Sequence, residues 1–293
     1  MISMGQLVGL LLAIILPVTV VVVLFLHTKK ELKCKGLFVA LCYGVVGYLW
    51  AAFIYALMRG MVANMMSQIP MFQEGAGQVV GITIISALFG LMMAAGLCWA
   101  MYLVNAREFR FEHGATVGLG FSFSYVVLTY ALTFGPYLID GFQIRFGTFS
   151  GTEETRQKVV SLMVENLYLA ILDMVIVVLV FSAITVVMSH YQQCGSKLHM
   201  FLAAFLPPFC FEFFNELLPM LLPDLVSSIV FNILFGLLAI GALWLMLTYL
   251  KTRKVMIKPG VSWPEPQQKK KSASGSGKSS GANFKYAGNK KKH

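Results

Sequence analysis

Long apolar stretches are the feature that most constrains how this chain folds. A helix needs about 20 consecutive apolar residues to cross the roughly 30 Å hydrocarbon layer of a bilayer. A stretch at about 198–222 is long enough but contains Pro207, Pro208 and Pro219. Six others meet the requirement plainly: about 7–27, 37–58, 79–104, 115–139, 159–189 and 226–250. The sequence therefore predicts an all-α, polytopic transmembrane helical bundle with about seven spans.

The composition excludes other broad classes of protein. Apolar residues make up 58% of the 293 residues and charged residues 12%, whereas soluble domains have about 45–50% and about 25%. Disordered chains lack this apolar content. The first apolar stretch has neither a basic segment before it nor a small-residue cleavage site, so we expect a retained span rather than a signal peptide.

Basic residues are concentrated at the C-terminal end. Residues 251–293 contain twelve of the 23 lysines and arginines but one acidic residue, Glu265. Lys, Ser and Gly dominate this segment, and such a composition buries too little apolar surface to fold. We therefore predict a transmembrane helical domain, 1–250, and a polybasic disordered cytoplasmic tail, 251–293. The tail suits anionic lipid or an acidic partner, and nucleic acid is disfavoured because aromatic residues are sparse in it.

Loop charges predict the orientation of the spans. With the N-terminus outside, the loops near 28–36, 105–114 and 190–199 face the cytoplasm together with the tail. These loops hold seven basic residues and the tail twelve, against four on the external side. Positively charged loops resist translocation. We therefore expect a multi-pass protein of the cell membrane, in contact with the lipid bilayer, with an external N-terminus and a cytoplasmic C-terminus.

Carboxylates fall inside the predicted spans, where an ionisable side chain is costly and points to function. Glu165 and Asp173 lie in the fifth span, and Glu212 and Glu216 lie in the sixth beside Asn215. These last three share one helical face, since residues three or four apart are neighbours on a helix. At 1.5 Å per residue, Glu165 lies about 10 Å below the outer boundary and Glu212 roughly 20 Å from the inner one. All five residues are therefore candidates for one shared pocket.

The sequence leaves open how these acids are neutralised. No Lys, Arg or His lies in the middle of a predicted span. The carboxyl groups are protonated, share a cation, or open onto water, with Arg59 reaching in from the outer end of the second span. In a further alternative, the prolines break the sixth segment into a re-entrant or interfacial piece whose acids are hydrated. These alternatives differ in what surrounds Glu212 and Glu216.

Glycines recur in the segment HGATVGLG (113–120). Gly114 and Gly118 form a small-xxx-small stripe, with Gly120 beside it, and such stripes allow helices to approach closely. A phosphate-binding loop would require a preceding strand, and none is predicted here. We therefore expect these glycines to pack helices together.

Four segments give the chain a resemblance to a known family. They are GLMMAAGL (90–97), HGATVGLGFSFSY (113–125), ENLYLAILD (165–173) and PFCFE (208–212). In order and spacing they resemble the motifs GxFEExxR, DGLxxGxGHGGxE, ERxxAxxxH and HxxxD of the YhfC-type intramembrane metalloproteases, which are related to the CAAX-protease group. The resemblance implies a multi-pass fold in which glutamates and histidines bind a metal that activates water for hydrolysis.

Most of the family's catalytic residues are replaced in this chain. Glu165 matches a glutamate of the third motif, and Glu212 stands at the aspartate of the fourth. The remaining matched positions carry other residue types: Met93, Ala94, Leu97, Phe121, Tyr125, Asn166, Asp173 and Pro208. Every histidine ligand is missing, and carboxylates alone suit cations harder than zinc. The resemblance implies a degenerate member without a cofactor, binding zinc or another divalent cation only if the family site survives.

Three hypotheses for the function follow. In the first, the protein is a catalytically inactive relative of these proteases, a pseudoenzyme that binds a membrane-protein partner or lipid through the relict pocket. In the second, it is a small transporter or an ion- or proton-handling protein that uses the intramembrane carboxylates. In the third, it is an active membrane hydrolase with an atypical site. The sequence does not decide whether the protein is an enzyme.

Overall fold

The computed structural model describes residues 2–32, 36–72, 74–105, 111–162, 164–193 and 196–256. Within these residues the chain is helical and forms no strand, so the all-α prediction is confirmed. The α-helices are α1 (Met4–Leu32), α2 (Leu37–Ser67), α3 (Gly75–Asn105), α4 (Phe111–Val126), α5 (Leu132–Phe146), α6 (Glu153–Val160), α7 (Val164–Gln193), α8 (Lys197–Leu221) and α9 (Asp224–Met256). A 3-10 turn, η1 (Pro70–Phe72), precedes α3, and a π-helical turn, η2 (Val127–Ala131), joins α4 to α5.

Seven helical segments of the described chain are long and apolar enough to cross a membrane. They are Met4–Lys30, Leu37–Ser67, Gly75–Val104, His113–Phe146, Val164–Gln192, Lys197–Leu221 and Leu225–Leu245. This confirms the prediction of a multi-pass membrane protein. Helix α9 continues to Met256, and the rest of the predicted tail, 257–293, lies outside the described residues.

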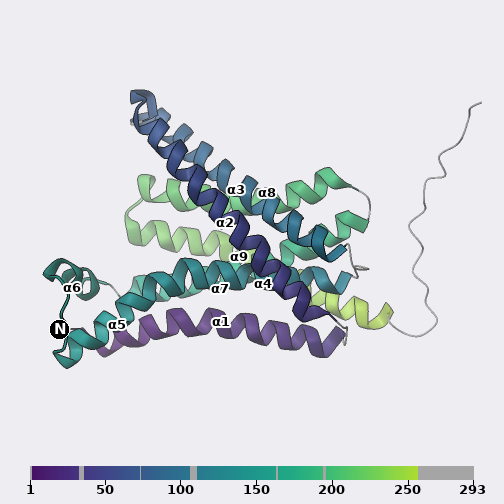
Figure 1. Ribbon diagram of the computed structural model, residues 1–293, viewed down its shortest axis with the longest axis horizontal. Helices are drawn as coiled ribbons and strands as arrows, with labels where there is room; N and C mark the ends of the chain where they lie inside the picture. The colour runs from purple at the N-terminus through teal and green to yellow at the C-terminus, as the bar shows by residue number, and fades with distance from the viewer. Residues whose placement is uncertain are drawn as a thin grey trace, which may run out of the picture. The chain divides into compact units, whose positions relative to one another are not determined.

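Helix α7 forms the centre of the transmembrane unit. It packs against α1, α4, α8 and α9, and Figure 1 shows it running between α1 and α9. Its side chains Met174, Val178 and Met188 are completely buried. On the other side, α2 packs against α3 and α4, and α3 packs against α8. Helix α8 therefore lies against α3, α7 and α9, and this position determines what its polar residues can reach.

Glycines allow α4 to approach two neighbouring helices closely. A Cβ atom at Gly118 would collide with the Thr185 side chain of α7. A Cβ atom at Gly120 would collide with the backbone of Leu41 in α2. Any larger side chain at these positions would push the helices apart. The prediction that this glycine stripe packs helices is confirmed.

The fifth span begins later than the sequence suggested. The segment Glu153–Val160 is a separate short helix, α6, and the Thr152 side chain caps it by accepting a hydrogen bond from the Thr155 backbone N–H (3.3 Å). Helix α7 begins only at Val164, so Glu165 lies in its first turn. Glu165 is therefore at a helix end, rather than about 10 Å inside a span as the sequence predicted.

Helix α8 is continuous over Lys197–Leu221 despite its three prolines. Its 25 residues span about 37 Å at 1.5 Å per residue, which is enough to cross the hydrocarbon layer. Four rings stack in sequence along it with centroids 5.5–5.9 Å apart: Phe201, Phe205, Phe209 and Phe213. Phe205 and Phe209 also pack onto Gly90 of α3. This packing supports the helix where proline removes backbone hydrogen bonds, so the prolines do not break the sixth segment.

Candidate functional site

Helices α2 and α8 are joined by polar contacts one helical turn apart. The Tyr55 hydroxyl donates a hydrogen bond to Glu212 Oε1 (3.2 Å), and Arg59 Nη2 donates to Glu216 Oε1 (3.3 Å). Each helix contributes residues four positions apart, which share one helical face. The two helices run parallel at this contact, so the residue four positions later on α2 pairs with the residue four positions later on α8. We call Tyr55, Arg59, Glu212 and Glu216 the α2–α8 cluster.

The contacts of the α2–α8 cluster differ in burial. Glu212 is 9% exposed, whereas the side chains of Arg59 and Glu216 are 47% and 41% exposed. The Tyr55 ring packs edge-on against Phe89 of α3, with centroids 5.1 Å apart. The Arg59 guanidinium lies 5.8 Å from the centre of the Tyr55 ring. Both glutamates therefore have protein partners, and Arg59 neutralises Glu216, as one of the alternatives from the sequence suggested.

Asp173 lies at a different place, beside a polar cavity between α7, α8 and α9. This cavity, here called the Asp173 cavity, has a volume of about 50 Å³. It is lined by Asp173, Phe214, Asn215, Leu218, Pro219, Ser227, Ser228 and Phe231. The Oδ1 atom of Asp173 is buried and has no hydrogen-bond partner in the protein. A carboxyl oxygen of Asp173 is thus left without a partner beside a cavity that polar side chains line.

Asn232 of α9 adds a second oxygen of this kind. Its side chain hydrogen-bonds to the Asp173 carboxyl group, and the residue is 5% exposed. Its Nδ2 atom donates a hydrogen bond to the backbone carbonyl of Ser228 (2.9 Å), while its Oδ1 atom is buried without a partner. Buried polar atoms are normally hydrogen-bonded. The two unpartnered oxygens therefore mark this region as one that accepts a donor or a cation.

Pro219 changes the backbone beside the Asp173 cavity. Proline has no backbone N–H, so the carbonyl of the residue four positions earlier lacks its helical partner. That residue is Asn215, which also lines the cavity. A water needs roughly 10–15 Å³ of such a volume, so about three to five waters or a small, partly dehydrated ion fit here. Sites for organic ligands are much larger, at roughly 300–1,000 Å³.

The structure does not bring the predicted site residues together in one pocket. Glu212 and Glu216 face α2, whereas Asp173 and Asn215 line the Asp173 cavity. Glu165 is exposed in the first turn of α7. A carboxylate is stabilised there by the partial positive charge of a helix N-terminus. The position of Glu165 therefore has a local explanation that requires no ligand.

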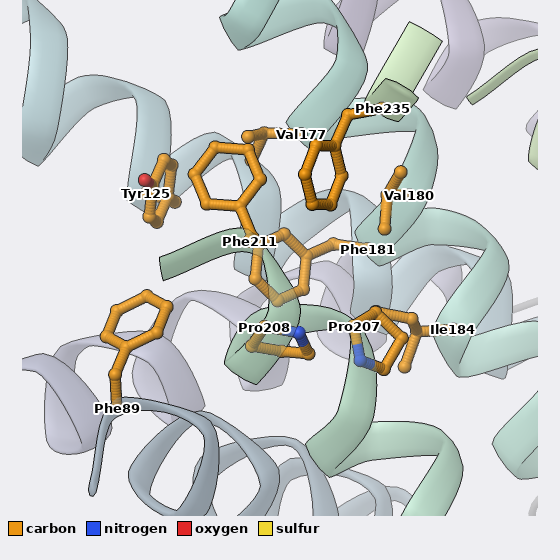
Figure 2. A pocket seen from close by; sticks show the side chains of 10 residues that line it. All are labelled: Phe89, Tyr125, Val177, Val180, Phe181, Ile184, Pro207, Pro208, Phe211 and Phe235. Atoms are coloured by element: carbon orange, nitrogen blue, oxygen red, sulfur yellow. The ribbon is translucent and has the colours of Figure 1, made fainter. Parts of the chain in front are cut away.

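A second cavity, shown in Figure 2, is apolar and has a volume of about 10 Å³. It is lined by Phe89, Tyr125, Val177, Val180, Phe181, Ile184, Pro207, Pro208, Phe211 and Phe235. Tyr125 and Pro208, which the family resemblance matches to a glutamate and a histidine, both lie on its wall. The rings of Phe181 and Phe211 lie between Tyr125 on one side and Ile184 on the other (Figure 2).

This apolar cavity offers no set of metal ligands. The Tyr125 hydroxyl is the one polar side-chain group among its lining residues. Across the part of the chain that the structure describes, no three His, Cys, Asp or Glu side chains lie close enough together to hold a metal ion. Tyr125 and Pro208 thus lie around packed hydrocarbon, with room for at most about one water.

The sequence pointed to Arg59 of the α2–α8 cluster, whereas Tyr55, Ser228 and Asn232 were missed. Tyr55 and Arg59 have the same four-residue spacing as Glu212 and Glu216, and this repeat is the signal that two polar helix faces match. Ser228 and Asn232 are likewise four residues apart on α9. Pairs of polar residues at this spacing within apolar helices mark faces that turn toward the bundle interior.

The fold defines the class of protein: a multi-pass helical membrane protein. Comparison of the chain with protein-family models, with curated proteins and with solved structures finds no match. The resemblance to the YhfC-type proteases therefore stays a prediction from the sequence motifs.

Proposed function

We propose that this membrane protein carries protons or small cations, and that Asp173 binds them. The observation that supports this most directly is the buried, unpartnered Oδ1 of Asp173 beside the Asp173 cavity. The cavity lies between α7, α8 and α9 and reaches the last turns of α8 at Pro219. Loop charges predict that this end of the bundle is external, so the site would be reached from that side.

The physical reason is that the negative charge of a carboxylate inside a membrane span must be neutralised or solvated. The desolvation penalty of a buried ion is several kcal/mol, so an intramembrane acid binds a proton, a cation or water. Ion pairs in the described residues join Arg59, Arg156 and Lys158 to other acids. The acids of the α2–α8 cluster have partners of their own. Asp173 forms none of these ion pairs, and its Oδ1 atom is buried without a partner beside a polar cavity.

Flux measurements in proteoliposomes test this proposal. The purified full-length protein is reconstituted, and proton or sodium flux down an imposed gradient is followed with an ion-sensitive dye. We expect the protein to raise flux above that of empty vesicles and Asp173→Asn to lower this flux at least tenfold. Glu165→Gln removes an exposed acid from the same helix and should leave the flux unchanged.

A second variant keeps the test valid if Asp173→Asn folds poorly. Asn215→Ala removes an amide from the wall of the Asp173 cavity without removing a charge, and should lower the flux several-fold. Monodisperse purification of each variant is the control for folding. Equal flux from the wild type and from empty vesicles would overturn the proposal.

A non-hydrolytic relative of the YhfC-type proteases is the second candidate. One observation favours it: Tyr125 and Pro208, matched to two ligand positions of that family, line the same cavity. This candidate expects purified protein without zinc and without peptidase activity. Stoichiometric zinc that is lost in Glu165→Ala and Glu212→Ala would refute it. Peptide release that Glu165→Ala abolishes would instead support an active hydrolase.

A further inference from the structure

We propose that the Asp173 cavity is a binding site for a partly dehydrated monovalent cation, and that Na⁺ is its best match. This inference rests on the proposed function and narrows it from protons and cations to one class of ion. The ligands would come from three helices. Asp173 of α7 supplies a carboxylate, Asn215 of α8 an amide and a backbone carbonyl, and Ser228 of α9 a hydroxyl.

The donor atoms select hard cations. Each polar residue given for the cavity wall offers oxygen, and no Cys, Met or His is found among the described residues that line it. Oxygen donors suit Na⁺, Mg²⁺ and Ca²⁺, whereas soft and borderline metals prefer thiolate, thioether and imidazole. The carbonyl of Asn215 is stronger as a ligand than an ordinary helix carbonyl, because Pro219 cannot donate to it. Asn232 Oδ1, beside Asp173, is one further buried oxygen that lacks a partner.

The charge of the wall selects a monovalent ion among the hard cations. Asp173 is the only ionisable side chain among the described residues that line the cavity. One Na⁺ would bring the site to zero net charge, whereas Mg²⁺ or Ca²⁺ would leave a positive charge inside the membrane, which is strongly unfavourable. Glu212 and Glu216 are not among the residues that line the cavity and hydrogen-bond to α2 instead.

The variant Pro219→Ala distinguishes a role of the Asn215 carbonyl in Na⁺ binding from a role of Pro219 in the stability of the fold. Alanine restores the N–H that pairs with the Asn215 carbonyl and removes the penalty of a proline within a helix. The variant should be more stable than the wild type without Na⁺, yet bind Na⁺ at least fivefold more weakly. Pro207→Ala makes the same change in α8 at a residue outside the Asp173 cavity. It should gain stability and keep its Na⁺ affinity.

Thermal unfolding of the full-length protein in detergent measures these effects. NaCl, KCl, LiCl, MgCl₂ and CaCl₂ are titrated against choline chloride at constant ionic strength. We expect Na⁺ to raise Tm saturably in the wild type and in Glu165→Gln. The Na⁺ shift should disappear in Asp173→Asn and need at least fivefold more Na⁺ in Pro219→Ala.

The outcomes distinguish this inference from the proposed function. A larger stabilisation by Mg²⁺ or Ca²⁺ than by Na⁺ would overturn the monovalent site. A Tm that no cation changes would also overturn the monovalent site. If proton flux still depended on Asp173 in that case, the proposed function would stand. Absence of both Na⁺ stabilisation and flux would overturn both. Since Pro219→Ala is expected to be the more stable protein, the test does not depend on a variant that misfolds.

Discussion

Removing the Tyr55 hydroxyl should destabilise the bundle more than removing the charged side chain of Arg59. Tyr55→Phe leaves Glu212, which is 9% exposed, without its hydrogen bond. Arg59→Ala leaves Glu216, whose side chain is 41% exposed, within reach of water or lipid headgroups. Burial rather than formal charge therefore decides which contact of the α2–α8 cluster matters for stability.

The magnitudes follow from these surroundings. A buried acceptor left unsatisfied costs about 1–3 kcal/mol, and interhelical hydrogen bonds inside a membrane protein contribute about 0.6 kcal/mol on average and about 1.7 kcal/mol at most. We therefore expect Tyr55→Phe to lower the free energy of unfolding by about 1–2 kcal/mol. A half-exposed ion pair contributes about 0–1 kcal/mol, so Arg59→Ala should cost less than about 1 kcal/mol.

Reversible unfolding in mixed detergent and SDS micelles, followed by circular dichroism, measures both free energies. A double-mutant cycle of Tyr55→Phe with Glu212→Leu isolates their contact and should give a coupling energy of about 1 kcal/mol. Tyr102→Phe removes a hydroxyl from a ring that is 69% exposed on α3, and should change stability by less than about 0.5 kcal/mol. A larger cost for Arg59→Ala than for Tyr55→Phe, or a coupling energy of zero, would refute the reasoning from burial.

The remaining predictions concern packing and orientation. Gly118→Leu should abolish folding or cost more than about 3 kcal/mol in the same unfolding assay, because its side chain would meet α7. Gly241→Leu, where nothing lies within 4 Å of the added Cβ, should be nearly neutral. Phe121→Ala empties a completely buried site and should cost about 3–5 kcal/mol, and a cost below 1 kcal/mol would argue against this packing. In a cysteine-free background, a membrane-impermeant thiol reagent should label Ser150→Cys in intact cells and Ser272→Cys only after lysis. The reverse labelling pattern would contradict the predicted orientation.

The membrane class and the number of spans could be predicted because each depends on a local property. An apolar stretch of sufficient length requires a helix in lipid, whichever helices surround it. The glycine stripe at Gly114 and Gly118 was predictable for a similar reason, since a missing side chain permits close packing wherever a neighbour lies. The start of α7 was not, because it depends on the capped helix α6 that precedes it. The effect of the prolines in α8 depends on phenylalanine packing against α3.

The sequence identified the acidic candidate residues but not most of the residues that they contact. Glu212 and Glu216 share a helix face, as predicted, but their partners Tyr55 and Arg59 come from a helix far away in sequence. Asp173 was expected beside those glutamates and lies instead against α9. Helical spacing tells which residues share a face and is silent about which helix that face meets.

The amino-acid sequence by itself determined that the chain is a helical membrane protein with acidic residues inside its spans, because apolar length and the cost of a buried charge do not depend on neighbours. Only the tertiary structure decided which acids have partners. Contacts between spans arise from side-chain packing, which the bilayer does not dictate, since lipid tails are as apolar as the side chains that they replace. That packing supplies Tyr55 and Arg59 to the glutamates of α8 and leaves an oxygen of Asp173 unpartnered beside a cavity large enough for a small ion.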